Sequence, residues 1–108
     1  MMRKIGERVG AISHADKDTD TVYLFGYGVY QGDLIPDAAL KVQFFGAPLD
    51  HPNPCLMLDS GKQVFGCECW WGGEESVKKE VAKFSNVVML DIEEERAKAQ
   101  PAERGERG

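Results

Sequence analysis

The segment Gln63-Val-Phe-Gly-Cys-Glu-Cys-Trp-Trp-Gly-Gly73 contains two thiols, one carboxylate and both tryptophans of the chain. Cys67 and Cys69 are two residues apart, so on a strand their side chains point the same way, with Cα atoms about 6.5–7 Å apart. That separation is at the outer limit for a disulfide, and structural zinc pairs usually have two to four residues between the cysteines. Further candidate ligands are Cys55, His14 and His51. Because no spacing among these residues requires a metal, we interpret the cysteines as small apolar core residues, with metal binding and redox chemistry as the alternatives.

No two residues in the sequence have the arrangement of a nucleophile and its base. His14 is the last residue of an expected strand, next to a polar turn, and His51 lies in a proline-rich loop. Nucleophilic catalysis by a cysteine needs a base close enough to activate the thiol, and no motif places one there. We therefore predict no catalytic residue, no metal and no cofactor, and we expect a protein that is not an enzyme.

The aromatic side chains are the best indication of a binding function. Tyr and Trp are enriched at recognition surfaces because they bury a large area and keep a polar group. Trp70 and Trp71 are adjacent, so on a strand they point to opposite faces. Glu68 is a charge within an otherwise apolar strand, either on a wet face of the sheet or at a binding surface beside Trp70. The alternative is that most of the rings fill a core. The candidate binding residues are Tyr23, Tyr27, Tyr30, Glu68, Trp70 and Trp71.

Length and charge limit the class of protein. A chain of 108 residues with 43 % hydrophobic and 29 % charged residues is long enough for one domain with a single core. The net charge of −5 argues against binding to double-stranded nucleic acid, which depends on a basic surface. No apolar run approaches the ~20 residues that span a bilayer, and the first residues do not resemble a signal peptide. With three cysteines, an odd number, we expect free thiols in a reducing cytoplasm and no membrane association.

The pattern along the chain predicts a β-rich domain over residues 1–92. The expected strands are residues 7–14, 21–30, 55–59, 62–71 and 86–92, and the expected helix is 74–84. Gly26 and Gly28 interrupt the second strand and favour a bend over close approach of another chain segment. Residues 34–54 contain four of the five prolines and form a loose insertion. The charged tail 93–108 has almost nothing to bury, so we expect disorder after one or two turns of helix.

Five short strands, a glycine-bent second strand and a helix before the last strand resemble an SH3-like barrel. The opening Gly6-Glu-Arg-Val-Gly-Ala-Ile12 is similar to the way such barrels begin, with a turn that enters the first strand. The resemblance covers about residues 6–92 and depends on the order of elements. It implies an aromatic binding groove beside the loops. A curved five-stranded sheet with one packed helix is the main alternative.

The small size, the isolated β-rich domain and the charged end are similar to short open reading frames of bacteriophages and other mobile elements. This resemblance implies a protein that binds a host protein or a nucleotide signal of anti-phage defence. Our first hypothesis is a non-enzymatic module that binds a host protein. The alternative is a protein that sequesters a nucleotide-like ligand, with rings stacked on a base. Both hypotheses are compatible with a homo-oligomer. The candidate phosphate-binding cations are Arg3, Arg8, Lys41 and Lys62.

Overall fold

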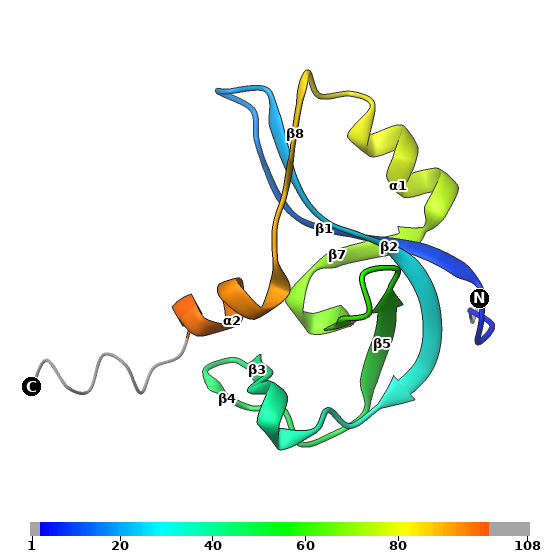
Figure 1. The fold of residues 1–108 in the computed structure, drawn as a ribbon, viewed down its shortest axis with the longest axis vertical. Coiled ribbons are helices and arrows are strands. Elements are labelled where there is room, and N and C mark those ends of the chain that lie inside the picture. Colours follow the sequence, from blue (N-terminus) through cyan, green and yellow to red (C-terminus); the bar gives the residue numbers. More distant parts are fainter. Residues whose placement is uncertain (1–2, 100–108) are drawn as a thin grey trace, which may run out of the picture.

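The computed structural model describes residues 3–99, which form a mainly β, α+β domain with an open six-stranded sheet and two short α-helices (Figure 1). A second, two-stranded sheet lies in the insertion. The elements in chain order are β1 (Arg8–Asp16), β2 (Thr21–Leu34), η1 (Ala38–Leu40), β3 (Gln43–Phe44), β4 (Ala47–Pro48), β5 (Asn53–Leu58), β6 (Gln63–Phe65), η2 (Gly66–Glu68), β7 (Trp70–Gly73), α1 (Glu74–Val81), β8 (Asn86–Met89) and α2 (Ile92–Ala99). No helix within residues 3–99 has the length and apolar character needed to cross a membrane.

The sheet is organised around β2, which has 14 residues and pairs with three strands, two of them along the same edge. β1 pairs antiparallel along one edge of β2. On the other edge, the first part of β2 pairs parallel with β8 and the second part pairs antiparallel with β5. β6 extends the sheet beyond β5 and β7 extends it beyond β1, which gives the order β6-β5-β2-β1-β7 with β8 as a branch. The sheet is therefore open, and η2 connects its two ends.

Two of the three glycines of β2, Gly26 and Gly28, have different reasons to lack a side chain. Gly26 has a φ of +135°, and the pairing of β1 with β2 shifts register beside it, so the strand bends there as expected. A Cβ at Gly28 would overlap the carbonyl oxygen of Met57, because the backbone of β5 passes directly beside it. The bend and the close approach that the sequence offered as alternatives thus both occur, two residues apart.

Three clusters of buried side chains stabilise the domain. The first lies between the sheet and the C-terminal segment and contains Val9, Ala11, Phe25, Leu56, Leu58, Val64 and Ile92. The second lies under α1 and contains Ile12, Val22, Leu24 and Val77. The third joins the insertion to the sheet and contains Val42, Leu49, Cys55 and Phe65. The insertion is therefore anchored by its own apolar contacts.

Three of the expected elements differ from the structure in their extent. The expected strand 62–71 is interrupted by η2, so Cys67 and Cys69 do not lie on one continuous strand. The helix expected at 74–84 is α1, which is shorter and follows β7, and the strand expected at 86–92 is β8, which ends at Met89. The expectation of a mainly β domain with a helix before the last strand is confirmed, but the sheet has six strands and is not closed.

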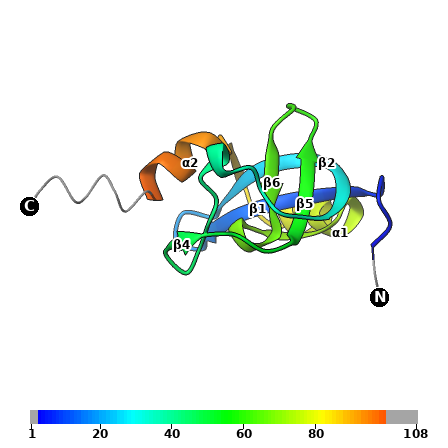
Figure 2. The same ribbon diagram turned by 90° about the horizontal axis from the view of Figure 1, so that it is seen from below.

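The C-terminal segment is more strongly packed than its composition predicted. Residues 92–99 form the two turns of helix that the sequence allowed, but α2 buries Ile92 and Arg96. Ile92 belongs to the strand expected at 86–92, whereas Arg96 belongs to the expected tail 93–108, so the expectation that this tail has almost nothing to bury fails at Arg96. Residues 100–108 lie outside the described range. Figure 2 shows α2 and the start of β1 on opposite sides of the domain.

Candidate binding site

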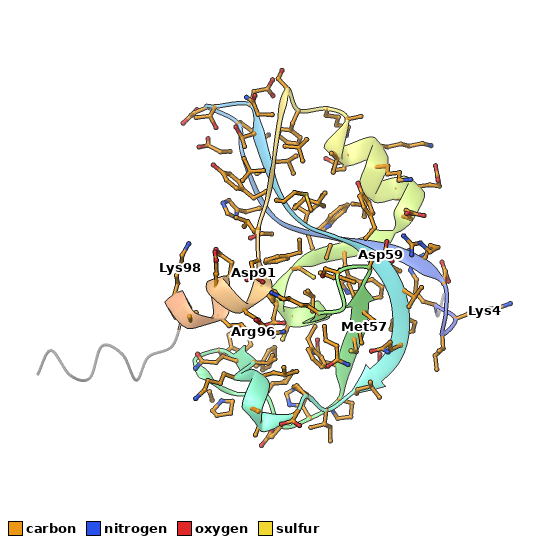
Figure 3. The ribbon with its side chains drawn as sticks, in the orientation of Figure 1. Lys4, Met57, Asp59, Asp91, Arg96 and Lys98 are labelled. Carbon is orange, nitrogen blue, oxygen red and sulfur yellow. The ribbon has the colours of Figure 1, made fainter. Side chains whose placement is uncertain are left out.

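Glu68 faces the interior, against the expectation of an outward-facing residue. Its side chain is 10 % exposed and accepts hydrogen bonds from Arg96, whose Nε and Nη2 lie 2.7 and 2.8 Å from its two carboxylate oxygens. The backbone N–H of Phe65 donates to the same carboxylate at 2.9 Å, and Arg96 Nη2 also donates to the carbonyl of Gln63. Figure 3 shows Arg96 pointing from α2 into the domain, while Lys98 points away from it. Glu68 therefore fixes α2 and does not present its carboxylate to a partner.

Tyr30 of β2 and Trp71 of β7 form one packed pair. Their rings are stacked with centroids 5.6 Å apart, and the Tyr30 hydroxyl donates to Asp33 at 2.6 Å. The guanidinium of Arg3 lies 5.9 Å from the centre of the Trp71 ring. These half-buried rings pack against the first core cluster, so much of their surface is already buried by contacts within the domain.

Tyr27 and Tyr23 also have internal partners. Tyr27 packs against the cluster under α1, lies over Gly10 and has the Lys78 ammonium 5.6 Å from its ring centre. Tyr23 stacks on His14 with ring centroids 4.4 Å apart. The predicted tyrosines thus lie in separate contacts and do not form a common platform.

Trp70 is the member of the predicted set that remains largely open to solvent, with 52 % of its surface exposed. It borders a hollow of about 350 Å³ whose lining includes Ile12, Val22 and Phe84. The imidazole of His14 and the carboxylate of Glu80 also line this hollow. An exposed indole beside an apolar hollow suits a flat or apolar group.

The thiols are placed as core residues, not as nucleophiles. Burial raises the pKa of Cys55 to about 11 and that of Cys69 to about 12, and it also raises the pKa of Cys67. All three are free cysteines, so each is mainly a neutral thiol near neutral pH. Within residues 3–99, no three His, Cys, Asp or Glu side chains come together as a group that could hold a metal ion.

Three of the cations proposed for a phosphate already have carboxylate partners. Arg8 makes two hydrogen bonds of 2.8 Å to Asp59 and a third of 3.1 Å to Glu74. Lys62 lies 2.7 Å from Asp91, and Arg3 lies 2.6 Å from Glu7. A phosphate at any of these positions would have to compete with an acidic side chain.

The insertion carries exposed aromatic residues that the sequence analysis did not select. β3 and β4 form a hairpin whose two-residue turn is Phe45-Gly46. Phe45 is 93 % exposed and has a φ of +54°, and Gly46 has a φ of +82°. The Phe45 ring lies 4.4 Å from that of Phe44, which in turn meets the His51 ring edge-on at 5.2 Å. The aromatic tip of the hairpin therefore projects into solvent.

A hollow of about 450 Å³ lies beside this hairpin. Its walls include Ile35, Pro36, Val42, Pro48 and Leu49, with the carboxylates of Asp37 and Asp50 at its border. Ile35 is 58 % exposed. We call the exposed residues Ile35, Phe44 and Phe45, together with this hollow, the insertion surface. The sequence contains only a weak signal for this surface, since Gly46 suits the second position of a two-residue turn but a Phe at the first position is unusual.

The chain matches no protein-family model, no curated protein and no solved structure. The fold and the site define the protein as a small mainly β domain that exposes an aromatic hairpin from an insertion.

Proposed function

We propose that this protein is a non-enzymatic binding module that holds a partner protein on its insertion surface. The observation that carries the proposal is Phe45, a bulky side chain that is 93 % exposed while its backbone occupies the left-handed region. Left-handed backbone costs an L-residue other than glycine roughly 1–2 kcal/mol, and residues such as Asn or Gly are usual in this kind of turn. The backbone conformation of Phe45 therefore costs free energy in the free protein, and burial of its ring within the domain does not offset this cost.

Burial in a partner would offset that cost. A Phe side chain gains about 1.5–3 kcal/mol when it moves from water into an apolar pocket. The adjacent ring of Phe44 limits the positions of Phe45, so less side-chain entropy is lost on binding. The neighbouring hollow accepts an apolar side chain from the partner. Anchors and pockets of this kind dominate the energy of protein–protein interfaces.

The position of the insertion supports the same function. The path β6-β5-β2-β1-β7, with the 3₁₀ turn η2 between β6 and β7, resembles the strand order of an SH3-like barrel that is left open. Barrels of that type bind through aromatic surfaces beside their loops. The insertion connects β2 to β5 and places its aromatic residues beside such a loop region. For a bacteriophage or mobile-element protein, the partner would be a host protein.

Affinity capture from host lysate with matched variants tests this proposal. We expect a specific partner to be retained by the wild-type protein and by Trp70→Ala, and to be lost with Phe45→Asn. Asn tolerates the left-handed region, so this variant removes the ring and keeps the turn. A partner that binds Phe45→Asn as well as the wild type would contradict the proposal.

Sequestration of a nucleotide-like ligand is the second candidate function, and the hollow beside Trp70 favours it. An exposed indole can stack on a base. A thermal-shift screen with cyclic nucleotides and ADP-ribose derivatives separates the two functions, because a ligand that binds the native state raises the melting temperature. A rise that Trp70→Ala abolishes and Phe45→Asn preserves would favour this second function.

A further inference from the structure

The outer edge of β8 is an uncovered strand edge with unusually apolar side chains. Val87, Val88 and Met89 are 47, 39 and 61 % exposed. The strand pairs with β2 on one side, and within residues 3–99 no strand pairs with its other side. Figure 1 shows β8 beside the β1–β2 hairpin and away from β5.

The backbone groups of this edge are oriented for a further ladder. The N–H of Asn86 donates to Asp20 and the N–H of Leu90 donates to Leu24. Backbone groups of successive strand residues point to alternate sides, so Asn86, Val88 and Leu90 face β2. Val87 and Met89 therefore direct their N–H and C=O groups to the open edge.

Most exposed strand edges carry features that prevent pairing with another chain. Charged side chains, prolines and bulges are the usual ones. The residues of β8 are Asn, Val, Val and Met, and none of these features occurs among them. In a chain of net charge −5, an uncharged strip is also where a second acidic copy meets the least repulsion.

We propose that two copies of this chain pair through β8 in an antiparallel arrangement with its twofold axis at Val88. In this register Val88 lies opposite the same residue of the second copy, and Val87 lies opposite the second copy's Met89. Residues opposite one another in an antiparallel pair point to the same side, so each copy keeps its faces aligned with those of the other.

The backbone hydrogen-bond pattern and the side-chain contacts both favour this register. Val87 and Met89 have outward backbone groups, so the two pairs that they form exchange about four hydrogen bonds. Val88 then occupies the close, non-hydrogen-bonded position, where side chains of opposite strands lie about 4.5–5.5 Å apart. Apolar side chains meet on both faces and no like charges oppose each other. The contact is small, so we expect a weak dimer.

Sedimentation velocity from about 10 µM to about 1 mM tests the proposal, because small interfaces associate in the micromolar to millimolar range. We expect the wild type to shift from monomer to dimer across this range. Val88→Lys and Val88→Asp should each remain monomeric, because each places two like charges at the axis. An equimolar mixture of the two variants should restore the dimer, since opposite charges then meet.

A proline pair tests the backbone component of the contact. Val87→Pro removes an N–H that faces outward, so we expect loss of the dimer with little change in melting temperature. Val88→Pro removes an N–H that bonds to β2, so its melting temperature should fall clearly. Phe45→Asn should leave the dimer unchanged, which separates this result from the proposed function.

Three results would overturn the proposal. The first is a wild type that stays monomeric at the highest concentration. The second is a dimer that persists in both Val88→Lys and Val87→Pro. The third is a monomer whose capture of a partner protein is lost in Val87→Pro, because the edge would then pair with a strand of that partner.

Discussion

Arg96 in α2 and Glu68 in η2, 28 residues apart, form a buried two-point ion pair that connects the C-terminal helix to the end of β6. Glu68 accepts the backbone N–H of Phe65 and Arg96 donates to the backbone carbonyl of Gln63, so the pair also fixes both ends of this short strand. The side chains are only 7 and 10 % exposed, and every contact named here is charge-assisted.

Removal of one member of this pair should destabilise the protein strongly. We expect Arg96→Met or Glu68→Leu to lower the free energy of unfolding by about 3–5 kcal/mol, because each leaves a buried charge without its partner. The double variant should cost less than the sum of the single variants. Urea denaturation measures all three. Lys98→Met, on the outer side of α2, should change the stability by less than about 0.5 kcal/mol, and an equal loss in this control would contradict the assignment.

Acid should weaken the contact of Arg8 with Asp59 and Glu74. Hydrogen bonds from Arg8 hold the pKa of Asp59 below its usual value of 3.8 and that of Glu74 below its usual value of 4.5. A carboxyl whose pKa is lower in the folded state stabilises the fold above its unfolded-state pKa, and this contribution is lost as the pH falls through the folded-state value. We therefore expect stability to decline below about pH 4.5. NMR titration of both carboxyls in Arg8→Gln should give higher pKa values than in the wild type, and unchanged values would contradict this.

The thiols should react slowly in the folded protein. Cys69, with a pKa of about 12, and Cys55, with a pKa of about 11, contain very little thiolate at pH 8. We expect Cys67, which is half-buried and less strongly shifted, to be alkylated by iodoacetamide before the other two. Mass spectrometry of timed samples gives the order, and in urea the three rates should converge. Rapid alkylation of Cys69 in the native protein would disprove the assignment.

Gly28 should not tolerate a methyl group. Gly28→Ala forces β2 away from the backbone of β5 at Met57, and we expect a loss of about 1–3 kcal/mol or more. Gly72→Ala is the matched control, because its added Cβ meets only the end of the Arg3 side chain, at 3.9 Å. Thermal unfolding of both variants compares the two positions. A similar small effect at both would mean that the two strands separate easily.

Phe45 should be a position where stability and binding conflict. Phe45→Gly removes the cost of the left-handed backbone, so we expect the free protein to gain about 0.5–1 kcal/mol in the free energy of unfolding. The same variant should bind the partner less well. Phe44→Ala, a neighbour outside the turn, should not stabilise the protein. Urea denaturation measures the free energies, and a loss of stability in Phe45→Gly would show that the ring packs within the domain.

Much of the secondary structure could be predicted because it depends on neighbouring residues. The aromatic and β-branched run before Gly26 identifies a strand, and the acidic start and apolar stripe of α1 identify a helix. The turn between β5 and β6 follows from Ser60-Gly61, where Gly61 has a φ of +94°. The position of the proline-rich insertion was equally clear from composition.

The candidate site was predicted only in part. Trp70 is exposed, but Glu68 and the tyrosines have internal partners that no local pattern reveals. Phe44 and Phe45 were not among the predicted residues, because the exposure of Phe45 follows from its place in the turn between β3 and β4.

Local sequence patterns were enough to locate most of the strands, the helix α1 and the turns, because these depend on contacts within a few residues, but they did not reveal the break at η2. The parallel pairing of β8 with β2, the open sheet and the contact of Arg96 with Glu68 became visible in the folded domain. These features join residues far apart in the chain. By local pattern alone, several other carboxylates could have been the partner of Arg96, and several other strands could have been the partner of β2. The choice among them depends on which side chains the folded core brings within a few ångströms of each other.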